Sequence, residues 1–156
     1  MAAKSAVDRS SGPGVLHTVE GSWRSELGSQ LELHNTEGFL TGRDISAVGS
    51  DRCPQALFGQ CTQPMSTGTV ILGFVVCWTG SSSLTTWTGR YDGATDRLNL
   101  HWVLETATHP PTAWRSTQLG QDTFYRDEWS VAQEVARWER TEQAGCLPPQ
   151  PGLTPG

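Results

Sequence analysis

The sequence has few charged residues and no long apolar run, and both shortages restrict what the chain can bind. Charged residues make up only 17% of the 156 residues, and the formal net charge is −5. A protein that holds a nucleic-acid backbone normally carries a basic patch, and none is visible here. No run of 18 apolar residues occurs, so no stretch predicts a membrane-spanning helix. We therefore expect neither nucleic acid nor a membrane as a partner.

Motifs for catalysis and metal binding are also missing. The sequence contains no G-x-S-x-G, no H-E-x-x-H and no phosphate-binding G-x-x-x-x-G-K. It has no C-x-x-C pair and no Cys/His cluster at zinc spacing. The four histidines lie far apart, and His101 is expected on the outer face of its strand. These absences predict a protein that is not an enzyme and needs no cofactor or metal.

Cysteine is scarce, and its pairing is left open by the sequence. The four residues Cys53, Cys61, Cys77 and Cys146 permit two disulfides or four free thiols. Cys53 and Cys61 would lie about 26 Å apart on an extended strand, too far to bridge each other. The first residues, 1–14, lack the apolar core of a secretory signal.

What the sequence has in excess is tryptophan, with seven Trp against two Tyr and four Phe. An indole N–H needs a partner when it is buried, so tryptophan is a demanding residue to place. Seven of them indicate a pocket or an interface built from indole rings.

Residues 20–126 show short alternating runs of apolar and polar residues, separated by turn residues, which is typical of an all-β fold. We expect residues 1–19 to form a flexible leader. Residues 127–156 are expected to form a C-terminal extension, helical to about 143 and then a Pro-rich tail. Short links favour up-and-down neighbours, and eight such strands close into an antiparallel β-barrel. The eight predicted strands are Gly21–Leu27, Gln30–Asn35, Phe39–Ala47, Gln55–Thr62, Val70–Thr79, Ser83–Tyr91, Arg97–Glu105 and Thr112–Arg126.

Strand parity predicts which side chains share a face. Ser83, Thr85 and Trp87 alternate by two, so two hydroxyls and an indole point the same way. The strand 70–79 is apolar on both faces. One face would line the barrel interior, and the other is expected to be covered by a neighbouring subunit.

Four motifs in order resemble the avidin and streptavidin family of biotin-binding proteins. The resemblance covers roughly residues 20–126, and it implies a barrel that binds biotin without catalysis. It also implies secretion and a homotetramer, with a dimer as the alternative. The motifs are G-x-W-x-x-x-L-G-S from Gly21, G-F-x-V-x-W from Gly73, S-x-T-x-W-x-G-R from Ser83, and W-[KR]-[SA]-T-x-x-G-x-D-x-F from Trp114.

The resemblance implies roles for individual residues of a biotin site. Indole walls would surround the bicyclic ring, and one further indole, Trp114, would enter a neighbouring subunit's pocket. Hydroxyls and one carboxylate would hold the ureido group, because that group offers one strong acceptor and two donors. A loop over 48–51, including Gly49 and Ser50, would act as a lid. The remaining implied site residues are Ser25, Ser29, Asp44, Ser46, Trp78, Ser81, Ser83, Thr85, Trp87, Trp102, Leu104 and Asp122.

Two positions depart from the family pattern. Ser25 stands where the family has Asn, and Asp44 stands where it has Tyr. An ionised Asp44 has only acceptors, so it would repel the ureido oxygen unless it is protonated or turned away. Losing one or two buried hydrogen bonds would weaken binding by roughly 10- to 10⁴-fold. Weakened biotin binding is therefore the first hypothesis. The alternatives are a different small amphipathic ligand, or an interaction module that presents its C-terminal tail.

Overall fold

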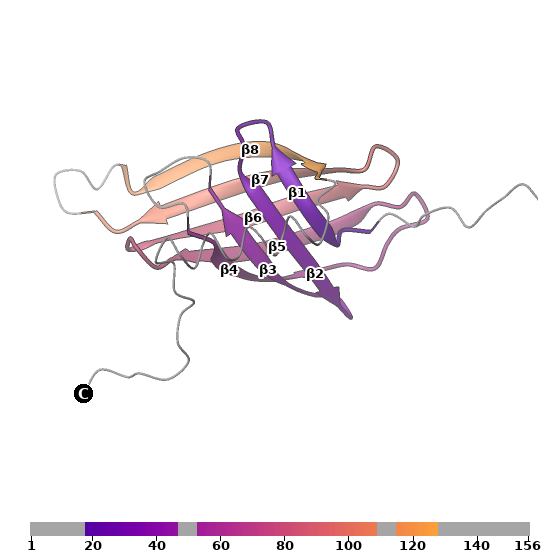
Figure 1. The fold of residues 1–156 in the computed structure, drawn as a ribbon, viewed down its shortest axis with the longest axis horizontal. Coiled ribbons are helices and arrows are strands. Elements are labelled where there is room, and N and C mark those ends of the chain that lie inside the picture. Colours follow the sequence, from indigo (N-terminus) through magenta and orange to yellow (C-terminus); the bar gives the residue numbers. More distant parts are fainter. Residues whose placement is uncertain (1–17, 47–52, 109–114, 128–156) are drawn as a thin grey trace, which may run out of the picture.

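A computed structural model describes residues 18–46, 53–108 and 115–127, and these residues form a closed antiparallel barrel of eight strands (Figure 1). Each strand pairs with the next, and β8 returns to pair with β1 through Trp23↔Arg126, Arg24↔Tyr125 and Ser25↔Phe124. The predicted up-and-down barrel is therefore confirmed. The strands are β1 (Gly21–Ser25), β2 (Gln30–Thr36), β3 (Phe39–Ile45), β4 (Gln55–Cys61), β5 (Val70–Trp78), β6 (Ser83–Asp92), β7 (Arg97–Thr106) and β8 (Thr117–Arg126).

The alternation of the strands determines what fills the barrel. On β6, Thr85, Trp87 and Tyr91 are buried, while the residues between them are half-buried or exposed. His101 is exposed on the outer face of β7, as its parity predicts. Closure leaves no free sheet edge among the described strands, so inward side chains from all of them meet in one core.

Five strands, β1, β3, β4, β5 and β8, are shorter than the sequence predicts, and contacts at the ends of β1 and β8 account for their bounds or the chain beside them. β1 ends at Ser25 and not at Leu27, because Gly28 N–H donates to the Ser25 carbonyl and turns the chain. Gly28 has φ 88°, a conformation that glycine adopts without strain. β8 begins at Thr117 and not at Thr112, although the Ser116 carbonyl already accepts a hydrogen bond from Thr106 N–H of β7.

Several expectations fall outside the described residues. These are most of the leader and the C-terminal extension with its predicted helix and Pro-rich tail. The described part of the expected leader, Thr18 and Val19, packs against the barrel, and Val19 is buried. Among the described residues, no helix is long and apolar enough to span a membrane.

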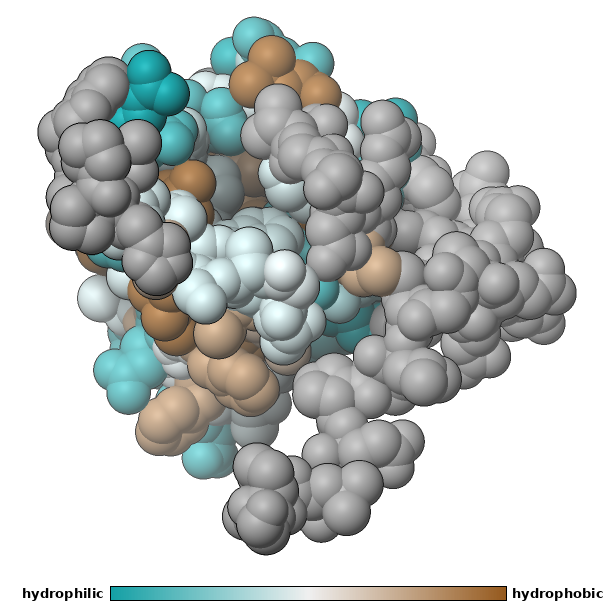
Figure 2. All heavy atoms as spheres, turned by 90° about the vertical axis from the view of Figure 1, so that its left-hand side faces the viewer, coloured by the Kyte–Doolittle hydropathy of each residue, from teal (hydrophilic) through white to brown (hydrophobic). Residues whose placement is uncertain are grey.

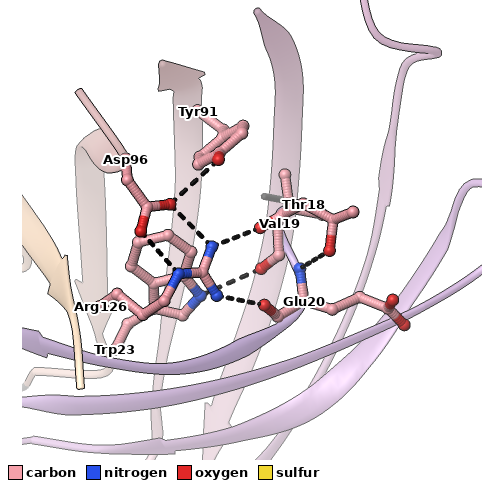
Figure 3. A network of polar contacts seen from close by, with 7 residues as sticks. All are labelled: Thr18, Val19, Glu20, Trp23, Tyr91, Asp96 and Arg126. Carbon is pink, nitrogen blue, oxygen red and sulfur yellow. Dashed lines mark hydrogen bonds and ion pairs between the residues drawn. The ribbon is translucent and has the colours of Figure 1, made fainter. Parts of the chain in front are cut away.

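Arg126 ties together the end of the barrel at which β1 begins (Figure 3). Its guanidinium donates to both Asp96 carboxylate oxygens at 2.7 and 2.8 Å, and to the backbone carbonyls of Thr18 and Glu20. Its planar group also lies 4.2 Å from the centre of the Trp23 ring. Tyr91 donates to Asp96, and Trp23 Nε1 donates to the Val19 carbonyl at 3.0 Å. This network holds the chain before β1 against that end of the barrel.

The cysteines are now partly assigned. Cys53 is disulfide-bonded, whereas Cys61 and Cys77 are free. Both alternatives that the sequence left open, two disulfides and four free thiols, are therefore excluded.

Candidate functional site

A cavity of about 340 Å³ lies at the end of the barrel where β3, β5 and β7 finish. Figure 2 views the molecule from this end, where residues of near-neutral hydropathy, coloured white, gather. The volume lies within the range of pockets that hold small molecules. The described lining residues are Leu27, Ser29, Asp44, Ser46, Trp78, Gly80, Ser81, Ser83, Thr85, Trp87, Trp102, Leu104 and Asp122.

The indole walls of the cavity come from three strands. Trp78 ends β5, Trp87 lies in the middle of β6, and Trp102 is paired with Trp87 on β7. The Trp87 and Trp102 ring centres are 6.4 Å apart at a tilt of 59°. Phe74 stacks on Trp87 from the core side at 6.0 Å, which fixes the floor of the cavity.

Hydrogen bonds fix the hydroxyls that line the cavity. Trp78 Nε1 donates to Thr85 Oγ1 at 2.7 Å, so one cavity wall orients a hydroxyl of another strand. Ser81 Oγ and Ser83 Oγ lie 2.6 Å apart and share a hydrogen bond. Each hydroxyl keeps further donor or acceptor capacity for a ligand, because a hydroxyl can donate once and accept twice.

Gly120 of β8 makes room for Trp102. The two residues are paired across β7 and β8, and a Cβ at Gly120 would meet Trp102 Cζ2 at 2.2 Å. The indole therefore occupies the space that a side chain at position 120 would fill, and Trp102 lines the cavity. Only glycine permits this approach.

Two carboxyl groups line the same cavity, one from β3 and one from β8. Asp44 is 2% exposed, and burial raises its pKa to about 7, helped by repulsion from Asp122. Burial also raises the pKa of Asp122. The Trp87 indole acts in the opposite direction and lowers the Asp44 pKa. Asp44 Oδ1 and Trp87 Nε1 are buried without a hydrogen-bond partner among the described residues.

Ser25 is the described site residue that does not line the cavity. It is buried, and its Oγ accepts from the Ser29 backbone N–H at 3.1 Å. Ser25 thus fixes the turn that carries Ser29 toward the cavity. Gly49, Ser50 and Trp114 lie outside the described residues, so their implied roles stay predictions.

The structure adds three residues that the sequence reasoning missed. Leu27 and Gly80 line the cavity at its rim, where no periodic pattern marks them. Gln55 is buried opposite Asp44 on β4, and its Oε1 accepts from Thr79 Oγ1 at 3.1 Å. A polar residue at an inward position before Leu57 is the signal that could have revealed Gln55.

The fold and the cavity define a class: a closed up-and-down barrel with a small-molecule pocket at one end. No group of three or more His, Cys, Asp or Glu suited to a metal occurs among the described residues. The chain belongs to the Avidin family, whose family model matches residues 15–127. Membership in that family implies non-catalytic binding of biotin.

Proposed function

We propose that this chain binds biotin in the cavity of its barrel, with one site per subunit and without catalysis. The observation that carries the proposal is the convergence of Trp78, Trp87 and Trp102 with hydroxyls and a carboxyl on one cavity. Indole walls bury a flat apolar bicycle, while hydroxyl donors and an acidic acceptor match the two sides of a ureido group. A closed barrel holds these groups in place before the ligand arrives, which favours tight binding.

Asp44 makes this binding depend on pH. Asp44 is one of the residues that line the cavity, which supports a contact with the ligand. With a pKa of about 7, it is partly protonated near neutral pH and can then donate to the ureido oxygen. Above that pH it is an acceptor that repels the same oxygen. We therefore propose biotin binding that is weaker than a Tyr donor would give, and that tightens as the pH falls.

Calorimetric titration with biotin tests the proposal. We expect one site per subunit, with a dissociation constant that decreases about tenfold or more in Asp44→Tyr, since that variant supplies a neutral donor. Glu37→Gln serves as a control, because Glu37 is exposed in the turn at the start of β3, whereas the cavity lies where β3 ends. It should leave the affinity unchanged.

Two results would contradict the proposal. Binding in Asp44→Tyr but none in the natural chain would mean that the pocket has moved to another small amphipathic ligand. No binding in either protein would exclude biotin and favour the interaction-module alternative, which deletion of residues 127–156 would then test.

The outer face of the barrel supports assembly. Phe58 of β4 and Ile71 of β5, on neighbouring strands, are 62% and 46% exposed in the single chain, and Leu119 of β8, on another part of the barrel, is 74% exposed. We propose a homotetramer, with a dimer as the alternative, in which Trp114 of one subunit enters the cavity of the next. Light scattering during size-exclusion chromatography would give the subunit number.

Secretion is the localisation that we propose. Members of the Avidin family are typically secreted. The disulfide at Cys53 is consistent with an oxidising compartment, where such bonds persist.

A further inference from the structure

The disulfide at Cys53 leaves a single partner within the sequence. Of the four cysteines, Cys61 and Cys77 are free, and the fourth is Cys146. A disulfide within one chain therefore joins Cys53 to Cys146, in the C-terminal extension beyond β8. Its formation removes one hydrogen from each thiol, and a disulfide oxidant such as oxidised glutathione takes up both hydrogens and becomes two thiols.

The start of the extension is held on β1. Asp127 N–H donates to the Ser22 carbonyl at 2.8 Å, and the Asp127 carboxylate accepts from Arg24 Nε at 3.1 Å. The chain therefore leaves β8 on the side of β1. Residues 128–145 separate this point from Cys146, and a segment of that length reaches roughly 60 Å when extended and roughly 28 Å when helical.

One row of paired residues leads from β1 across the outer face to β4. Its pairs are Ser22↔Glu32, Glu32↔Arg43 and Arg43↔Ala56. Neighbouring strands lie about 4.8 Å apart, so the row covers roughly 15 Å, and Cys53 lies at most roughly 10 Å beyond Ala56 along the chain. Residues 128–145 are long enough to follow this row, whether they are extended or helical.

The route around the other side of the barrel leads away from Cys53. From β8, Tyr125 is paired with Arg97 of β7, and Arg97 is paired with Asp92 at the end of β6. This row continues to the start of β5, which lies beside the end of β4 and not beside its beginning. The row across β1, β2 and β3 is therefore the direct route.

Outward side chains along the direct row are shielded, whereas those of the adjacent row are open. Glu32 and Arg43 point outward by strand parity, because each is followed by a buried residue. The Glu32 side chain is 23% exposed, and Arg43 Nη1 has almost no exposed surface. His34 and Thr41, paired with each other in the adjacent outward row, are exposed. An outward guanidinium nitrogen loses its contact with water when another part of the chain lies over it.

We propose that residues 128–145 form a strap that crosses the outer face of β1, β2 and β3 along this row and is fastened by the Cys53–Cys146 disulfide. The segment supplies carboxylates that suit the guanidinium of Arg43. These belong to Glu128, Glu134, Glu139 and Glu142. The disulfide fastens the strap next to the cavity, because Gln55, just after Cys53, is paired with Asp44 of the cavity lining.

A non-reducing digest followed by mass spectrometry tests the pairing. Cleavage after Phe58 separates Cys53 from Cys61 and Cys77. We expect one linked pair of peptides, carrying Cys53 and Cys146, that comes apart on reduction. A bond from Cys53 to Cys77, or to a second chain, would overturn the inference.

Modification of arginine by p-hydroxyphenylglyoxal tests the position of the strap in the folded natural chain. We expect Arg43 to react about tenfold or more slowly than Arg90, which is exposed on the outer face of β6. In Cys146→Ser the Arg43 rate should rise about fivefold or more, because the far end of the strap is released, while the Arg90 rate stays the same. Cys77→Ser replaces a free thiol and is the matched control, so it should keep both natural rates.

Two further measurements protect the comparison. Near-ultraviolet circular dichroism shows whether each variant is folded before labelling, and mild reduction of the natural chain releases the strap without any substitution. Equal rates at Arg43 and Arg90 in the natural chain would overturn the inference, because the row would then be open. A slow Arg43 that stays slow after the disulfide is opened would overturn it too, since another segment would then cover the row. None of these readouts uses biotin, so the proposed function is tested separately.

Discussion

At the scale of single residues, Asp44 combines a stability cost with a binding role. Asp44 is one of the residues that line the cavity, but its side chain is buried, and its Oδ1 has no hydrogen-bond partner among the described residues. Burying an unpaired carboxylate is unfavourable, so the folded chain holds the proton more tightly than the unfolded chain does. A buried polar group that costs stability while lining a pocket is typical of a residue retained for its ligand.

The cost at Asp44 predicts how stability changes with pH. The pKa rises from 3.8 in the unfolded chain to about 7 in the folded one. Below pH 4 both states are protonated, and between 4 and 7 only the folded state keeps the proton, so stability falls as the pH rises. Above pH 7 the penalty from this residue reaches on the order of 4 kcal/mol.

Asp44→Asn should remove that penalty. We expect its melting temperature to exceed that of the natural chain by several degrees at pH 8.5 and by little at pH 4.5. Scanning calorimetry of the apo protein at both pH values measures the difference. A difference of equal size at both pH values would contradict the raised pKa, and Glu37→Gln should show no such change.

At the scale of strands, the register between β7 and β8 determines the shape of the cavity. Gly120 lies beneath the indole of Trp102, where its missing side chain leaves the space that the ring occupies. Asp122, two residues further along β8, points to the same side and reaches the cavity. One strand thus supplies both the space for an aromatic wall and an acidic group.

Gly120→Ala should therefore affect stability and binding together. The new Cβ would meet the ring at 2.2 Å, so Trp102 must shift toward the cavity. We expect a loss of about 1–3 kcal/mol in the free energy of unfolding, as for other overpacked sites, and weaker ligand binding. Urea unfolding and ligand titration measure the two effects. Gln121→Ala, at the exposed neighbouring position, is the control, and equal behaviour of the two variants would refute the steric argument.

At the scale of the whole molecule, the two ends of the barrel differ in their contacts: one end holds the Arg126 network and the other holds the cavity. The end near Arg126 is held by ionic, cation–π and backbone contacts that fasten Thr18 and Glu20. The opposite end carries the cavity, with unpaired polar atoms and two carboxyl groups whose pKa is raised by burial. We therefore expect changes at the Arg126 end to affect the free energy of unfolding, and changes at the cavity end to affect ligand binding.

Replacing the cation at the stable end tests this division. Arg126→Met should lower the free energy of unfolding by about 2–4 kcal/mol, because it leaves Asp96 and two carbonyls without their donor. Ligand affinity should change by less than about twofold, since no cavity residue is touched. Chemical denaturation and calorimetric titration measure the two quantities. Arg90→Met, at an exposed position of β6, is the control, and a large loss of affinity in Arg126→Met would contradict the division.

The sequence by itself determined the class of fold and predicted most of the residues that line the cavity. Alternation along the strands gave the barrel and the inward residues, such as Thr85 and Trp87, because side chains in a strand change face at every residue. The ordered motifs gave the family and the site residues on β5, β6 and β8. The stretches over 48–51 and 114 lie outside the described structure, and their roles are still predictions.

Only the tertiary structure determined the pKa of Asp44, and with it the protonation state of its carboxyl. From the sequence it could be turned away or protonated, since a pKa depends on neighbours that are distant in the chain. Closing the barrel places Asp44 of β3 in one cavity with Trp87 of β6 and Asp122 of β8, and removes it from water. The same closure brought Arg126 onto Asp96, Thr18 and Glu20, contacts that no local pattern predicts. The alternation of residues along a strand can be read from the sequence. The burial and protonation state of a side chain depend on which strands the closed barrel brings together.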